Sequence, residues 1–216
     1  MLQLVIGDKN YSSWSMRPWV LLTQAGIAFE EIQVWLREPD TKANIARYSP
    51  SGTVPVLIDD DLKVHDSLAI CEYLAEKFPE KSLWPRDTAQ RARARSVSAE
   101  MHSSFNGLRG RMPMNIRNRY LGRGMNEEVA ADVVRLSAMW GECLARSGGP
   151  WLFGEFGIAD AMYTPMVFRL QTYGVALQGA ALQYLDTMLA TPALVKLAAQ
   201  AAVEPHPLAS YDQIYP

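Results

Sequence analysis

The chain has 216 residues, of which 49% are apolar and 20% charged, and its formal net charge is −2. This is the composition of an ordinary globular protein, and it provides no overall positive field for nucleic acid or for an acidic membrane surface. No apolar run is long enough to span a bilayer, and the first residues, MLQLVIGD, lack the basic leader of a signal peptide. Cys71 and Cys143 lie in apolar periodic segments, so we expect free thiols and a cytoplasmic protein.

The first part of the chain is predicted to form a small mixed sheet with helices packed against it. Alternating apolar residues indicate strands at residues 2–6, 32–36, 54–59 and 62–65, the last two as a hairpin. Helical spacing indicates a helix over residues 19–25, which ends at Gly26, and another over residues 66–78. An α/β fold follows from this order of elements.

The rest of the chain is predicted to be helical. Prolines and scattered charges interrupt the periodicity after residue 78, and no convincing strand follows residue 88. Helices are expected from Asn126 to Cys143 and over residues 158–173, 180–190 and 193–202. We therefore predict two domains, an α/β domain of residues 1–81 and an all-helical domain of residues 87–216.

The segment KNYSSWSMRPW, residues 9–19, crowds three serines between a predicted strand and a helix. Pro18 fits best in a first helical turn, so Ser15 is the simplest N-cap and Ser12 and Ser13 lie in the preceding loop. If the helix starts earlier, Pro18 lies inside it and must kink it. Free backbone N–H groups and the helix dipole favour an anion near Ser12 and Ser13. The alternative is that both serines only satisfy the turn.

Two further segments have polar or backbone groups that could bind a ligand. Asp66 and Ser67 begin a helix, where a hydroxyl can receive a carboxylate and the aspartate can pair with an amine. The alternative is a simple helix cap. A cis Val54–Pro55 bond would expose the backbone of Val54 to a ligand as in an added strand, although the sequence leaves the isomer open.

These segments together resemble one family. YSSWSMRPW, GTVPVLIDDDLKVHDSLAICEYLAEKFP and GIADAMYTP are similar to the cytosolic glutathione transferases, and the resemblance extends over the whole chain. It implies a thioredoxin-like N-terminal domain, an all-helical C-terminal domain, glutathione as co-substrate and a homodimer. The serine segment most resembles the zeta class and related serine-type enzymes.

The resemblance also implies roles for individual residues. Ser12 falls on the catalytic serine, and Ser13 is the second candidate. The backbone of Val54 and a cis Pro55 would bind the cysteinyl part of glutathione, and Asp66 and Ser67 its γ-glutamyl end. A serine hydroxyl is too weak an acid to act as a base at neutral pH, so Ser12 would instead donate a hydrogen bond to the glutathione thiolate.

The chain departs from the family pattern at two positions. Gly157 stands where the helix capping box with Asp160 usually has serine or threonine, and glycine caps only slightly less well. Trp14 stands where zeta-class enzymes have cysteine, which argues against the isomerase reaction of that class more than against thiol activation.

The electrophile site is less well defined by the sequence. Met101, Phe105, Met112 and Met114 are core residues or, as in the family, line an apolar electrophile pocket. Arg109 and Arg111 are candidates for binding an acidic substrate. We expect a transferase for small, mostly apolar electrophiles; the alternatives are a zeta-like cis–trans isomerase for a diketo acid and a non-catalytic binding module.

The remaining charged residues indicate no further site. Three scattered histidines and no cysteine pair provide no metal site. The arginines of residues 86–95 have acidic neighbours and no interleaved aromatic residues, so we expect a solvated helix face and not a nucleic-acid surface.

Overall fold

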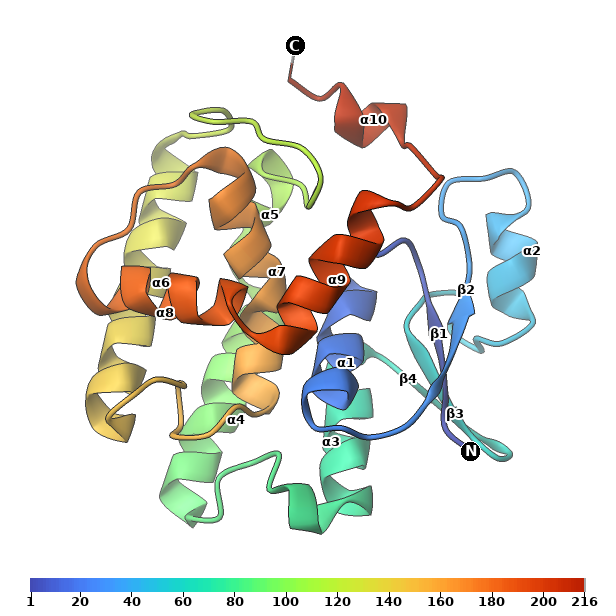
Figure 1. Cartoon of the computed structure of the whole chain (residues 1–216), viewed down its shortest axis with the longest axis horizontal. Helices are drawn as coiled ribbons and strands as arrows, with labels where there is room; N and C mark the ends of the chain where they lie inside the picture. Colours follow the sequence, from blue (N-terminus) through green and yellow to red (C-terminus); the bar gives the residue numbers. More distant parts are fainter. Residues whose placement is uncertain (216) are drawn as a thin grey trace.

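A computed structural model of the chain describes residues 1–215 and shows a small sheet on one side and a group of helices on the other (Figure 1). The strands are β1 (Gln3–Ile6), β2 (Glu30–Gln33), β3 (Val56–Asp59) and β4 (Leu62–His65). The helices of this first part are α1 (Ser13–Gln24), α2 (Thr41–Ala46) and α3 (Ser67–Lys77), followed by a 3₁₀ turn (Pro79–Lys81). The helices of the second part are α4 (Thr88–Ser103), α5 (Asn106–Arg111), α6 (Glu127–Ser147), α7 (Ile158–Tyr173), α8 (Gly179–Leu189), α9 (Pro192–Ala202) and α10 (Ala209–Asp212). The predicted fold class, an α/β part followed by an all-helical part, is confirmed.

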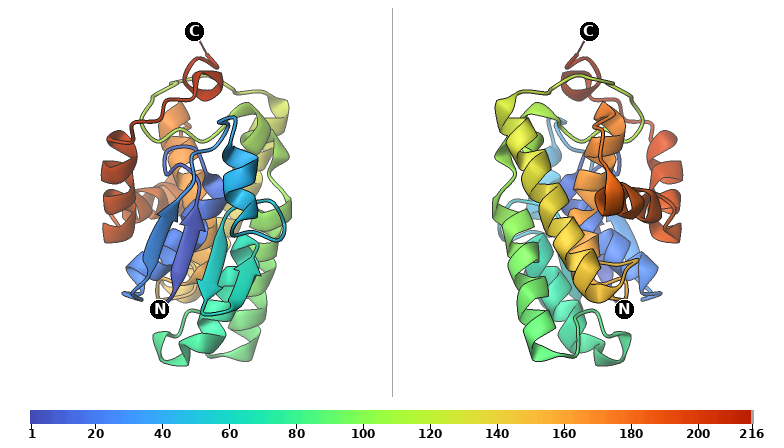
Figure 2. Two further views of the ribbon diagram at one scale, coloured as in Figure 1. Left: turned by 90° about the vertical axis from the view of Figure 1, so that its right-hand side faces the viewer. Right: turned by 90° about the vertical axis from the view of Figure 1, so that its left-hand side faces the viewer.

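The four-stranded sheet has the order β2-β1-β3-β4, with β1 parallel to β2 and the other pairs antiparallel. Strand pleating sends alternate side chains to opposite faces. Leu4 and Leu57 therefore enter the main core with α1 and α3, while Val5 and Val56 pack with Ile45 of α2 on the other face. Figure 2 shows α2 in front of the sheet and the helical part behind it.

The start of α1 differs from the prediction. Helix α1 begins at Ser13, and its N-cap is Ser12, whose hydroxyl accepts a hydrogen bond from the backbone N–H of Ser15 at 3.4 Å. Ser15 is therefore not the cap, and that prediction was wrong. Pro18 lies inside the helix, where its missing N–H removes a single helical hydrogen bond. The preference of proline for the first turn was a weaker signal than the capping serine.

Strand β2 and helix α2 also differ from the prediction. Strand β2 covers Glu30–Gln33 and not residues 32–36, because β1 ends at Ile6, whose carbonyl accepts the last hydrogen bond from Val34. Helix α2 was missed because its six residues are too few for a helical apolar pattern and its N-cap makes no side-chain hydrogen bond.

The helical part is organised around α7, which is buried along almost its whole length and packs against α1, α4 and α8. The predicted start of α6 is confirmed, since Asn126 Oδ1 accepts from the backbone N–H of Val129 at 2.9 Å. One continuous apolar core runs from the sheet through α1 into α7. The predicted boundary between two domains therefore stays a prediction.

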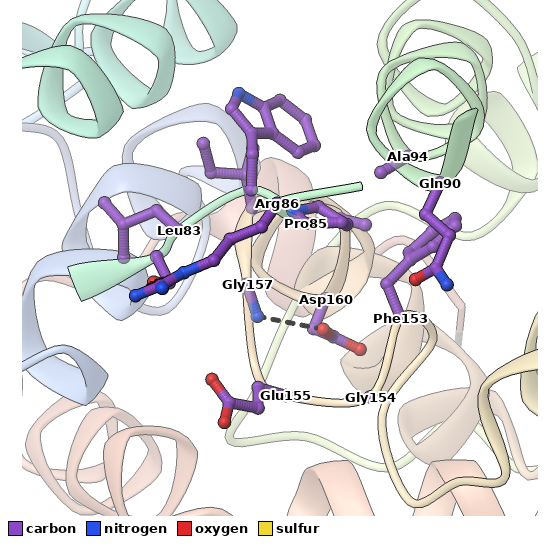
Figure 3. A pocket seen from close by; sticks show the side chains of 14 residues that line it. Leu83, Pro85, Arg86, Gln90, Ala94, Phe153, Gly154, Glu155, Gly157 and Asp160 are labelled. Atoms are coloured by element: carbon purple, nitrogen blue, oxygen red, sulfur yellow. Dashed lines mark hydrogen bonds between the residues drawn. The ribbon is translucent and has the colours of Figure 1, made fainter. Parts of the chain in front are cut away.

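The start of α7 explains the glycine in the capping box. Gly157 N–H donates to the buried carboxylate of Asp160 at 3.0 Å, as Figure 3 shows. A Cβ at Gly157 would lie 2.7 Å from the carbonyl oxygen of Leu83. Serine or threonine is thus excluded by the close approach of the connecting segment, and the capping function rests on Asp160. Among residues 1–215, no helix is long and apolar enough to cross a membrane.

Candidate active site

The predicted site segments meet at one edge of the sheet. Val5 pairs with Val56, and Val56 pairs with His65. The loop after β1, the residues before β3 and the residues after β4 therefore lie side by side. These three segments carry the predicted site residues Ser12 and Ser13, Val54 and Pro55, and Asp66 and Ser67. The structure thus brings together all six residues, which are separated by up to 55 positions in the sequence.

The serines at the start of α1 form a short chain of hydroxyl groups. The backbone N–H of Gly7 donates to Ser15 Oγ at 3.0 Å, and the Ser12 hydroxyl is 2.8 Å from Ser15 Oγ. Ser12 and Ser15 are both buried, at 7% and 3% exposure. Ser13 is partly exposed, and its hydroxyl makes no hydrogen bond with any other described residue. The Ser12 hydroxyl thus has a partner in the protein, whereas the Ser13 hydroxyl has none among residues 1–215.

The Val54–Pro55 peptide bond is cis. Val54 is half-buried, and its backbone N–H and C=O make no hydrogen bond with other residues in the described part of the chain. A half-buried backbone without partners costs free energy unless a ligand or water completes its hydrogen bonds. The strand-like groups of Val54 are therefore available at the edge of the site.

The start of α3 presents a second set of polar groups. Asp66 Oδ1 caps the helix by accepting from the N–H groups of Leu68 and Ala69 at 2.8 and 3.2 Å. Its other oxygen lies 3.2 Å from His102 Nε2. Asp66 has φ 74° and ψ 133°, a sparsely populated conformation that costs about 1–3 kcal/mol and is found mostly at functional sites. The N–H of the buried Ser67 makes no hydrogen bond within residues 1–215, so it remains available to a ligand.

A cluster of cationic and aromatic side chains lies beside these groups. The guanidinium carbons of Arg17 and Arg109 lie 4.3 and 4.7 Å from the centre of the Trp14 ring, and the His102 ring meets Trp14 edge-on at 5.1 Å. Arg17 Nη1 donates to Ser67 Oγ at 3.2 Å, which links α1 to α3. The sequence pointed to Arg109 but not to this cluster, because its members come from α1, α4 and α5.

The electrostatics of the cluster follow from burial and from like charges. Burial, together with repulsion from Arg109 and Arg169, lowers the pKa of Arg17 to about 9, and the group keeps its charge at neutral pH. Burial likewise lowers the pKa of Arg109. Burial also lowers the pKa of His102, and the positive charges of Arg17 and Arg109 lower it further, whereas the carboxylate of Asp66 acts to raise it. The cluster therefore has an excess of positive charge.

The C-terminal segment and the second part of the chain fix the loop before Ser12. Glu204 accepts from the backbone N–H groups of Lys9 and Asn10 at 2.7 and 2.9 Å. Arg117 donates to the carbonyl of Glu204 and to the hydroxyl of Tyr11. In Figure 1 this segment crosses from α9 toward α10 above the sheet. The loop is thus rigidly placed by residues far away in the sequence.

Other predicted positions lie elsewhere. Met101, Phe105 and Met112 are buried to 3% exposure or less in the main core, so they pack as core residues. A cavity of about 320 Å³, shown in Figure 3, is lined by residues of the segment between α3 and α4, of α4, and of the loop and first turn of α7, and by none of the predicted glutathione-site residues. Cys71 and Cys143 are buried free thiols. Among residues 1–215, no group of metal-ligating side chains is gathered.

A mixed four-stranded sheet with a cis proline before β3, joined to a helical part through α1 and α7, defines the fold class of the glutathione transferases. Models of the "Glutathione S-transferase, N-terminal domain" and the "Glutathione S-transferase, C-terminal domain" match residues 11–77 and 117–196. The chain belongs to the glutathione S-transferase family, as predicted.

Individual relatives agree with this assignment. Glutathione S-transferase Z1 of Arabidopsis thaliana is 40% identical over 89 residues, which cover 39% of this chain and 40% of that protein. Glutathione S-transferase 1 of Dianthus caryophyllus is 30% identical over 77% of this chain and 76% of its own length. A probable maleylacetoacetate isomerase of Caenorhabditis elegans is 26% identical over 78% of each chain. A glutathione transferase homolog from Burkholderia gl BGR1, solved with bound glutathione, has a TM-score of 0.70 at 25% identity and covers 93% of this chain and 97% of its own.

Proposed function

We propose that this protein is a glutathione transferase that ionises the thiol of glutathione at the start of α1. The observation that carries the proposal is the meeting of the start of α1, the start of α3 and the unpaired backbone of Val54 at one sheet edge. Residues 1–81 would bind glutathione, and residues 87–216 would contribute to the electrophile site.

The free polar groups match two of the three parts of glutathione, the cysteinyl backbone and the γ-glutamyl end. The N–H and C=O of Val54, beside cis Pro55, suit the cysteinyl backbone in the manner of an added strand. The N–H and hydroxyl of Ser67 suit the γ-glutamyl carboxylate, and the half-exposed Asp66 carboxylate suits the ammonium group. The buried Arg17 behind Ser67 adds attraction for that carboxylate.

Ser12 would stabilise the thiolate through the chain of hydroxyl groups. When glutathione binds, Ser15 can donate its proton to Ser12 Oγ, because each hydroxyl has one proton and two acceptor positions. Ser12 can then donate to the sulfur without movement of the heavy atoms. A hydrogen bond to the charged form and the positive end of α1 both lower the thiol pKa from its ordinary value of about 8.5.

The reaction that follows is nucleophilic attack by the sulfur. The thiolate lone pair forms a C–S bond, and the leaving group departs with its bonding electron pair. If the electrophile is instead an activated double bond, the carbon that receives the electron pair takes a proton from water. Ser13, whose hydroxyl has no partner among residues 1–215, is the second candidate for the sulfur contact.

A second candidate function is the isomerisation of a diketo acid, supported by the similarity to maleylacetoacetate isomerases such as that of Caenorhabditis elegans. Trp14, in place of the zeta-class cysteine, argues against it. A third candidate function is that of a non-catalytic module that binds glutathione only.

We also propose a cytoplasmic homodimer with a role in detoxification, on the basis of the family resemblance. Light scattering coupled to gel filtration tests the dimer.

Glutathione binding and thiol ionisation distinguish these functions. Calorimetry measures binding to the wild type and to Ser12→Ala, Ser13→Ala and Ser67→Ala, and the ultraviolet absorbance of the thiolate measures the pKa of bound glutathione. We expect a lowered thiol pKa that rises in Ser12→Ala, and weaker binding in Ser67→Ala. No binding at millimolar glutathione would exclude the transferase, and normal binding with an ordinary thiol pKa would favour the non-catalytic module. Turnover of maleylacetoacetate would favour the isomerase.

A further inference from the structure

The cluster around Trp14 lies at the first turn of α1, beside the serines that would hold the glutathione thiolate. Trp14 follows Ser13 directly on the first turn of α1, and its ring touches Arg109 of α5 and His102 of α4. It therefore closes the space between the serine segment and the second part of the chain. The chemistry of this wall is cationic, in contrast to the apolar pocket that the sequence led us to expect.

The orientation of Arg109 is fixed by the end of α4. Its Nη1 donates to the carbonyl oxygens of Met101, His102 and Ser104, at 3.5, 3.0 and 3.3 Å. Carbonyls at the end of a helix carry partial negative charge and attract a guanidinium. The contact with the Trp14 ring, whose centre is 4.7 Å from the guanidinium carbon, restrains the group as well. Arg109 is thus preorganised, with little further side-chain entropy to lose when it binds a ligand.

The other edge of this guanidinium has no hydrogen-bond partner among residues 1–215. Nε and Nη2 of Arg109 make no hydrogen bond with any residue in the described range 1–215, and the side chain is partly exposed. These two N–H groups form the parallel fork that matches the two oxygens of a carboxylate. Because Arg109 contacts Trp14, its guanidinium lies beside the turn of α1 that follows Ser12.

Within residues 1–215, the cluster of Arg17, Arg109 and His102 has more cationic groups than carboxylates in contact with it. One oxygen of Asp66 caps α3, and the other faces His102 and, in the proposed complex, the ammonium group of glutathione. Arg17 is 1% exposed, has its Nε buried without a partner, and uses Nη1 on the neutral Ser67. A buried charge without an opposite charge is costly. Arg17, behind Ser67, faces the γ-glutamyl end of glutathione, which leaves Arg109 for a second anion.

We propose that the electrophile carries a carboxylate, which binds to the Nε–Nη2 edge of Arg109 beside Trp14. This inference rests on the proposed transferase function and names its substrate class. Arg109 is then a specificity-determining residue, and the preferred electrophiles are small, conjugated or aromatic carboxylic acids and not neutral apolar compounds.

A matched pair of substrates tests the proposal: 4-chloro-3,5-dinitrobenzoate and its methyl ester. In both, the glutathione thiolate forms a C–S bond, the C–Cl bond breaks, and chloride leaves with the electron pair. The ratio of kcat/KM for the acid to that for the ester, each corrected for the uncatalysed rate, is measured for wild type, Arg109→Met, Arg109→Lys and the exposed neighbour Arg111→Met.

We expect the wild type to prefer the acid. Arg109→Met should lower kcat/KM for the acid by about tenfold to a hundredfold, the range of a hydrogen bond to a charged group. The acid-to-ester ratio should fall with it, Arg109→Lys should be intermediate, and Arg111→Met should keep the wild-type ratio. With the wild type, unreactive 3,5-dinitrobenzoate should inhibit ester turnover more strongly than 3,5-dinitrobenzamide does, which tests the site without altering the fold.

Several results would overturn the proposal. A wild type without preference for the acid, or an acid-to-ester ratio unchanged in Arg109→Met, would show that Arg109 binds no substrate carboxylate. A rise in KM for glutathione in Arg109→Met, equal with both substrates, would assign the free edge to glutathione. Failure of the transferase function itself is distinguishable, because then glutathione would not be ionised and neither substrate would be turned over.

Discussion

Replacement of Ser15 by alanine tests the chain of hydroxyl groups most directly. Ser15 Oγ accepts from the backbone N–H of Gly7 and lies 2.8 Å from the Ser12 hydroxyl. In Ser15→Ala the buried N–H of Gly7 loses its acceptor, which costs about 1–3 kcal/mol of unfolding free energy. Domains are commonly stable by about 5–15 kcal/mol, so the variant should fold.

The effect on the glutathione thiol should be smaller than that of Ser12→Ala. A hydrogen bond to a charged group contributes about 1.5–3 kcal/mol, so Ser12→Ala should raise the thiol pKa by about 1–2 units. Ser15 acts only by strengthening the Ser12 donor, and such cooperativity is about 10–30% of a bond. Ser15→Ala should therefore raise the pKa by roughly 0.1–0.7 units.

The assay is a pH titration of the thiolate absorbance at saturating glutathione, with Ser15→Thr as the control that retains a hydroxyl. We expect the highest thiol pKa in Ser12→Ala, a smaller rise in Ser15→Ala, and the wild-type pKa in Ser13→Ala. If Ser13→Ala raised the pKa and Ser12→Ala did not, the sulfur contact would belong to Ser13. If Ser12→Ala raised it and Ser15→Ala left it unchanged, Ser12 would act without the chain of hydroxyl groups.

Two further predictions concern stability. Asp160→Asn turns an amide N–H₂ toward at least one donor and should cost about 1–3 kcal/mol in urea unfolding. Burial raises the pKa of Asp160 to about 6, so the carboxyl group contributes favourably to the free energy of unfolding below about pH 4, and this contribution is lost as the pH rises through 6. The unfolding free energy of Asp160→Asn should lack this pH dependence. An unchanged pH dependence in the variant would contradict the assignment to Asp160. For His206, burial lowers the pKa, but hydrogen bonds to Glu38 and Asp8 outweigh it and raise the pKa. The charged His206 therefore contributes fully to stability below about pH 6.5, and this contribution is lost as the pH rises through the raised pKa. The melting temperature of His206→Gln should not show this loss of stability. A variant whose melting temperature changes with pH in parallel with that of the wild type would argue against the contacts of His206 with Asp8 and Glu38.

The sheet was predictable because its strands are short, alternate clearly and end in recognisable turns. The hairpin of β3 and β4 and the start of α3 lie within two residues of their predicted bounds. The position of Asp66 follows from these local signals. Helices α2 and α5, each of six residues, could not be predicted, because a helix of that length takes its stability from tertiary contacts and has no readable apolar stripe.

The placement of the serines shows where local rules compete. Proline at the first turn and serine at the N-cap both predict a start for α1, but three residues apart. In the structure the helix is capped by Ser12. The Ser12 hydroxyl also contacts the hydroxyl of Ser15, which accepts from the N–H of Gly7 just after β1. That contact depends on where β1 ends relative to the helix, which no property of the segment alone determines.

Trp14 shows why the electrophile site was only partly visible in the sequence. Its significance comes from Arg109 and His102, which lie about ninety positions away and reach it only because α4 and α5 pack beside the start of α1. Arg109 could be selected as a cation near the site, but its free edge depends on the carbonyls that occupy Nη1. Under the proposed function, the charge of the accepted electrophile would therefore depend on tertiary packing, whereas the proposed glutathione-binding segments have patterns that the sequence shows on their own.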